Sequence, residues 1–192
     1  MKFTKTIPIF AFFAIFGACT VEHAEEQVLS YHVNDIKKSS VWVYPSGEIL
    51  KQTEWYTNGI KKLEIPFKDN LPHGMFKQWT DLGDVVATGY YKKGKKDGKW
   101  ISYFYDKKIQ AKRYYEDDHP VGDWEGFHYD GGKAFEEHYS DDGDSIGVWK
   151  KWYPNGTLAE ENTCHSRDSV GYIRFYASDS TISSDYTCRK GK

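Results

Sequence analysis

The sequence has few cysteines, little charge imbalance and no long apolar run after its first residues. Three cysteines among 192 residues are too few for a scaffold held by many disulfides. The 26 basic and 28 acidic side chains nearly cancel, so no basic surface for nucleic acid is expected. No apolar run beyond residue 18 is long enough to cross a bilayer as a helix.

Aromatic residues are abundant instead. They make up 17% of the chain, together with 28% charged residues. Disordered chains usually contain few aromatics. The combination favours a thin β-structure, in which each aromatic ring covers a large area and most other positions face water.

One short phrase recurs four times between residues 74 and 164. Its copies are GMFKQW, GKWISY, GDWEGF and GVWKKW, which begin at Gly74, Gly98, Gly122 and Gly147. Such a nearly constant period is typical of a repeat architecture. Each period contains a β-rich run, a turn and a second β-rich run, and therefore predicts one hairpin. Because a lone hairpin is marginally stable, we expect an all-β fold in which stacked hairpins pair into one elongated antiparallel sheet.

Two columns of aromatic residues follow from the phrase. Residues two and five positions after each glycine differ by an odd number, so they should point to opposite faces of the sheet. We assign the first column to packing between hairpins, since it follows glycines that would let neighbouring backbone approach. The first column is Phe76, Trp100, Trp124 and Trp149. We expect the second column to be the more exposed row and take its members as candidate binding residues. They are Trp79, Tyr103, Phe127 and Trp152.

The repeats resemble the variant MORN (membrane occupation and recognition nexus) repeat, with its pattern G-x-W-x-x-[YW] followed by an Asn-Gly or Asp-Gly turn. The resemblance covers about residues 42–164, and Phe76 stands where the pattern has Trp. It implies a non-enzymatic protein whose hairpin sheet contacts proteins or lipids. Many similar bacterial proteins are described as YwqK-type antitoxins, so an antitoxin-like immunity role is one alternative.

Residues 1–18 are interpreted as an export signal. Lys2 and Lys5 precede a short apolar run that is not long enough to span a membrane. The run ends in Gly17-Ala18-Cys19, which resembles the bacterial lipobox. That resemblance implies that Cys19 is the lipid anchor, and Thr20 after it implies the outer membrane. The alternative is an ordinary secretory signal, with Cys19 left as a plain thiol.

Three further segments are predicted after the signal. Residues 19–39 are expected to form an acidic tether, for which a surface-export signal is the alternative. Residues 40–164 are expected to form the repeats, and residues 165–192 a C-terminal capping hairpin. Cys164 and Cys188 are one repeat period apart, and in an oxidising envelope we expect them to form a disulfide. Two independent buried thiols are the alternative.

No catalytic or metal-binding pattern is recognisable. The seven histidines lack the spacing of zinc ligands, and the acidic turn 141–144 lacks the order of a calcium loop. We therefore expect no catalytic residue, no metal and no cofactor. The sequence favours a lipid-anchored interaction protein with an envelope protein as its partner. A carbohydrate-binding or cell-wall-binding module is the alternative, because regular aromatic rows also stack on sugars, and a glycosidase is a more distant one.

Overall fold

A computed structural model describes residues 22–165 and 170–189, and these residues form strands and no helix. The strands are β1 (Glu25–Tyr31), β2 (Lys37–Val43), β3 (Ile49–Trp55), β4 (Lys61–Lys68), β5 (Leu71–Pro72), β6 (Gly74–Trp79), β7 (Val85–Lys92), β8 (Lys95–Tyr103), β9 (Ile109–Glu116), β10 (His119–Pro120), β11 (Gly122–Phe127), β12 (Lys133–Tyr139), β13 (Ser145–Trp152), β14 (Leu158–Asn162), β15 (Gly171–Tyr176) and β16 (Ile182–Cys188).

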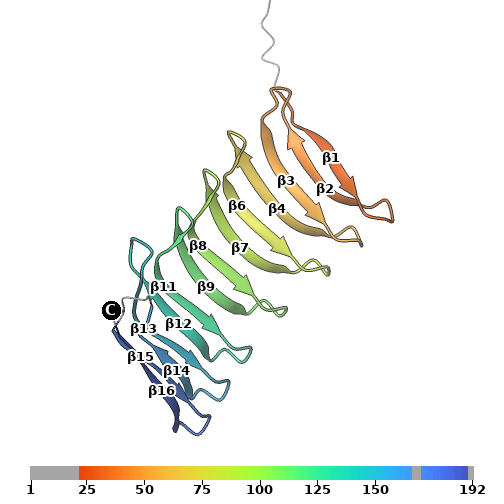
Figure 1. The fold of residues 1–192 in the computed structure, drawn as a ribbon. Coiled ribbons are helices and arrows are strands. Elements are labelled where there is room, and N and C mark those ends of the chain that lie inside the picture. Colours follow the sequence, from red (N-terminus) through yellow and green to blue (C-terminus); the bar gives the residue numbers. More distant parts are fainter. Residues whose placement is uncertain (1–21, 166–169, 190–192) are drawn as a thin grey trace, which may run out of the picture.

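The strands form one open antiparallel sheet in which neighbours in sequence are neighbours in space (Figure 1). The very short strands β5 and β10 pair only with β4 and β9, respectively, and lie off this path. Strands β1 and β16 are the two edges. The predicted all-β sheet of stacked hairpins is confirmed. Its contacts are local, because each hairpin touches only the hairpins before and after it.

Tight turns of one kind join the strands along one side of the sheet. In each turn the first amide donates to the carbonyl four positions later, as from Tyr56 to Ile60 at 2.8 Å. The residue just before that carbonyl has a positive φ, which is 82° at both Gly59 and Gly156. The two Asn-Gly pairs of the sequence therefore stand where left-handed backbone is needed.

Two of the glycines that begin the repeated phrase act differently from our expectation. A Cβ on Gly98 or Gly122 would meet no atom within 4 Å, so neither position serves a close approach of backbone. Their φ angles are 69° and 66°, and this left-handed conformation is the reason for glycine. The close approaches lie elsewhere. A Cβ on Gly89 would stand 2.1 Å from the Trp100 ring, and one on Gly126 would stand 2.0 Å from Phe135.

The first aromatic column packs as predicted, and it interleaves with tyrosines from the return strands. Phe76 stacks on Trp100 with ring centroids 5.3 Å apart. Trp124 lies 5.0 Å from Tyr115 and 4.8 Å from Tyr139. We call the whole run the aromatic ladder and its side of the sheet the aromatic face. The ladder is Phe76, Tyr91, Trp100, Tyr115, Trp124, Tyr139, Trp149 and His165.

Gly89→Ala should lower the free energy of unfolding by about 1–3 kcal/mol, the usual cost of forcing an extra group into a packed site. The new methyl would overlap the Trp100 ring, which is held between Phe76 and Tyr115. Gly132→Ala is the control, because its Cβ would approach only Asp130 Oδ1 at 3.3 Å. Urea denaturation compares the two variants. Equal midpoints would show that the ladder tolerates the added group.

The predicted acidic tether is wrong from Glu25 onward. Residues 25–31 form β1, which pairs antiparallel with β2, and β2 already begins at Lys37. The Glu26 carboxylate accepts hydrogen bonds from Lys37 Nζ at 2.7 Å and from Ser40 Oγ at 2.9 Å. The lysine hydrogen bond lowers the pKa of Glu26. Glu26 can therefore lie within a strand, because Lys37 of the neighbouring strand neutralises its charge.

The C-terminal hairpin continues the sheet and is covalently joined to it. Strand β15 pairs with β14 and with the edge strand β16. Cys164 and Cys188 form a disulfide with their Cα atoms 6.0 Å apart. The predicted disulfide is confirmed, and it joins the segment after β14 to the end of β16.

Candidate functional site

The second aromatic column lies on the face opposite the ladder. Lysine ammonium groups lie over three of its rings, at 5.9 Å from Trp79 (Lys61), 5.2 Å from Phe127 (Lys112) and 5.7 Å from Trp152 (Lys133). Within residues 22–165 and 170–189, none of the four rings contacts another aromatic ring. The opposite orientation of the two columns is thus as predicted.

A row of mostly polar side chains crosses the same face. Lys112 is opposite Glu125, and Glu125 is opposite Glu136, so their side chains share one face. We call this side the polar face. This row was not predicted from the sequence, although its members recur at nearly regular intervals along the chain. The row is Ser40, Thr53, Glu64, Lys77, Thr88, Ile101, Lys112, Glu125, Glu136, Lys150, Glu161, Arg174 and Asp185.

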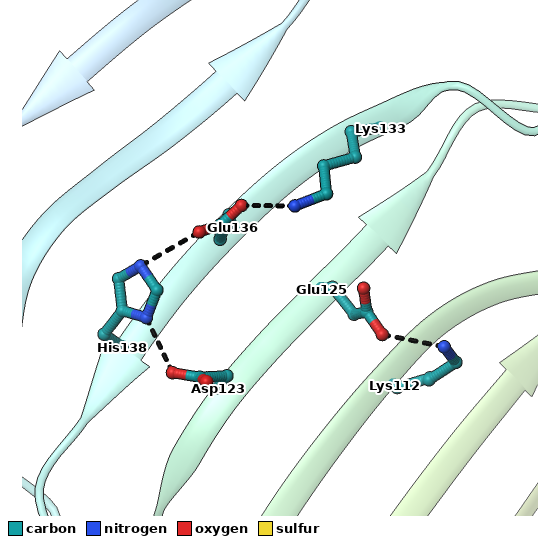
Figure 2. A network of polar contacts seen from close by, with 6 residues as sticks. All are labelled: Lys112, Asp123, Glu125, Lys133, Glu136 and His138. Atoms are coloured by element: carbon teal, nitrogen blue, oxygen red, sulfur yellow. Dashed lines mark hydrogen bonds and ion pairs between the residues drawn. The ribbon is translucent and has the colours of Figure 1, made fainter.

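The centre of the row is a network of paired charges on β9, β11 and β12 (Figure 2). Lys112 Nζ lies 2.7 Å from Glu125 Oε1. His138 stands between two carboxylates, with Nδ1 2.7 Å from Asp123 and Nε2 3.2 Å from Glu136. Glu136 also accepts a hydrogen bond from Lys133. This region contains charges of both signs, so it offers no large field of one sign.

The pKa shifts on this face favour ionised carboxylates. The hydrogen bond from Lys133 lowers the pKa of Glu136. In Glu64, burial acts to raise the pKa, but hydrogen bonds and charges from Lys61 and Lys51 together outweigh it, and the pKa is lowered. A carboxyl with a lowered pKa stabilises the fold at neutral pH, and that contribution is lost as the pH falls through the folded-state value. A proton donor for acid catalysis needs the opposite shift.

The four candidate binding residues are all half-buried, which differs from the more exposed row that we expected. Exposure does not separate the two columns, because the first column is also half-buried apart from Phe76, which is 9% exposed. The lysine side chains that cover Trp79, Phe127 and Trp152 explain the difference.

Tyr103 is the member of the second column with a different setting. It lines two clefts, one of about 450 Å³ and one of about 500 Å³. The first contains Asp81 and Gln110, and the second contains Lys77 and Lys107. Clefts of about 300–1,000 Å³ are the usual size of ligand sites. Tyr103 is therefore the best-placed candidate binding residue.

Cys19, the predicted lipid anchor, lies outside the described residues. Over residues 22–165 and 170–189, no helix is long and apolar enough to cross a membrane. In the same part of the chain, no group of three or more His, Cys, Asp or Glu side chains is placed to hold a metal ion.

Comparisons with known proteins agree with the repeat pattern. The family model described as the MORN repeat variant matches residues 96–117 and 146–163. No curated protein matches the chain. The first matched segment contains most of β8 and all of β9, and the second contains most of β13 and all of β14, so each corresponds to one hairpin. These two hairpins are therefore similar to MORN repeats of the variant type.

Proposed function

We propose that this chain is a non-enzymatic, lipid-anchored repeat protein of the bacterial cell envelope that holds a partner protein against the polar face of its sheet. The observation that carries the proposal is the division of the aromatic residues between two faces. One column joins a continuous ladder of rings, whereas the other makes no ring contact within the described residues. Trp and Tyr are enriched at protein interfaces because they combine large apolar area with a polar group.

The polar face suits a reversible interface. Most charges of its polar row are paired within the sheet, so a partner that displaces water from them leaves few charges without a counterion. Its aromatic rings lie among lysines and carboxylates, an arrangement that resembles an interface in which polar groups surround a few anchor residues. The lipid on Cys19 would keep this face close to the outer membrane, where an envelope protein would meet it.

A capture experiment tests the interaction. The full chain, tagged at its C-terminus, is crosslinked in cells and purified from the envelope fraction, and the crosslinked proteins are identified by mass spectrometry. One protein captured in fixed ratio supports the proposal. The Cys19→Ala variant should leave the membrane fraction and lose this partner.

A different outcome would contradict the proposal. If no protein is captured and an oligosaccharide protects the tryptophans from quenching by acrylamide, the chain is a carbohydrate-binding module instead. The tryptophans of the second column, Trp79 and Trp152, would be the ones protected.

A further inference from the structure

One side chain in each hairpin begins the turn on the same side of the sheet. The backbone amides of these residues all donate to the carbonyl four positions later. One such position recurs in every repeat, so each lies next to its counterparts in the neighbouring hairpins. The row is His32, Tyr56, Thr80, Phe104, His128, Tyr153 and Ala177.

Large polar members of this row join one hairpin to the next. Tyr56 Oη donates to the Trp79 carbonyl at 2.8 Å, and Tyr153 Oη donates to the Tyr176 carbonyl at 2.9 Å. His32 and His128 make the same contact through Nε2, at 2.9 and 2.8 Å. In all four cases the acceptor lies at the end of a strand in the next hairpin. We call this contact the inter-hairpin clamp.

The clamp is missing at Thr80. The threonine hydroxyl accepts the amides of Leu82 and Asp84 in its own turn, at 3.2 and 3.1 Å. The Tyr103 carbonyl is the counterpart of the acceptors in the other clamps. In the part of the chain that the structure describes, the Thr80 hydroxyl makes no hydrogen bond to it. Thr80 is also much smaller than its neighbours Tyr56 and Phe104. A small residue between two large ones leaves a gap in the row.

The 450 Å³ cleft lies at this gap. Four aromatic residues line it, and its polar lining residues include Thr80, Asp81 and Gln110. No lysine or arginine is among its lining residues, and Asp81 forms no ion pair within the described residues. The cleft therefore combines aromatic walls with one carboxylate that has no counterion. The aromatic lining is Tyr56, Tyr103, Phe104 and Tyr105.

We propose that this cleft binds an arginine side chain of the partner protein, a proposal that rests on the proposed function. A guanidinium group stacks on aromatic faces and pairs with a carboxylate, here Asp81. Its several N–H groups also supply a donor for the Tyr103 carbonyl, the counterpart of the carbonyls that accept the clamp in other hairpins. The partner thus completes the row where the chain itself leaves it open.

The test uses two peptides and the full chain. The probes are acetyl-Gly-Arg-Gly-amide and the same peptide with citrulline, which keeps the shape of arginine and lacks its charge. Nuclear magnetic resonance shifts of the Thr80 and Asp81 amides follow binding at millimolar peptide. The arginine peptide should bind about tenfold more tightly than the citrulline peptide, as expected for a desolvated cation–π contact.

Two variants locate the site. Thr80→Tyr should abolish arginine binding, because the new ring fills the cleft and supplies a hydroxyl for the clamp. Asp81→Asn should weaken binding about tenfold, and it tests the proposal even if Thr80→Tyr fails to fold. Asp130→Asn is the matched control, since Asp130 lies in an equivalent turn outside the cleft and should leave binding unchanged.

Three results would overturn the proposal. They are equal binding of the two peptides, undiminished binding to both Thr80→Tyr and Asp81→Asn, and displacement of the arginine peptide from the same amides by an oligosaccharide. If Thr80→Tyr still captures the envelope partner at the wild-type level, the arginine site is wrong while the proposed function stands.

Discussion

Trp124→Ala should lower the free energy of unfolding by about 3–5 kcal/mol, the usual cost of truncating a large aromatic residue in a packed site. The Trp124 ring lies between Tyr115 and Tyr139, at 5.0 and 4.8 Å, and Arg113 lies 5.6 Å from it. Its Nε1 donates to the Tyr114 carbonyl at 2.9 Å, so the truncation also removes this hydrogen bond. The loss is large beside the roughly 5–15 kcal/mol of a typical domain.

Trp152→Ala is the matched comparison, because it removes the same side chain from the other column. Within the described residues, Trp152 contacts the Lys133 ammonium at 5.7 Å and no aromatic ring. Its truncation should therefore cost clearly less than that of Trp124. Urea denaturation followed by circular dichroism measures both. If Trp152→Ala is the more destabilised variant, the second column carries the packing and our assignment of the two faces is reversed.

Replacing both Cys164 and Cys188 by Ser should lower the free energy of unfolding by about 3–4 kcal/mol. The disulfide closes a loop across a sequence separation of 24, and its removal restores the conformational entropy of the unfolded chain. The loss should appear first in β15 and β16, because this hairpin forms one end of the sheet and has a neighbouring strand on one side only.

Denaturation with and without a reductant checks the disulfide prediction. Reductant should shift the wild-type protein to the stability of the double Ser variant and should not affect that variant. A double variant as stable as the oxidised wild type would show that the hairpins alone hold the C-terminal end.

The repeat pattern predicted most of the fold because the same physical requirements return in every hairpin. Trp100 and Trp124 recur at one position, since each ring must pack on its neighbours in the ladder. Alternation along a strand then separated this column from Tyr103 and Trp152. The disulfide was predictable for a related reason, because Cys164 and Cys188 are one repeat apart.

Features that depend on contacts between different hairpins were not predictable in this way. Strand β1 has no alternation of apolar residues to reveal it in the sequence. Its half-buried Glu26 is held in the sheet by hydrogen bonds from Lys37 and Ser40. Gly89 and Gly126 are needed for rings that approach from the next strand, and nothing in their own sequence context indicates this. The cleft at Thr80 exists because its neighbours in space are larger, a comparison that requires the stacking order of the hairpins.

The measurement that tests the division of the two faces most directly is partner capture by a Tyr103→Ser, Trp152→Ser double variant of the full chain. We predict that the captured protein falls at least about tenfold relative to wild type, because aromatic anchors contribute about 2 kcal/mol or more each at an interface. The melting temperature should stay close to that of wild type, since neither ring belongs to the ladder. Undiminished capture by a folded double variant would contradict the assignment of binding to the polar face.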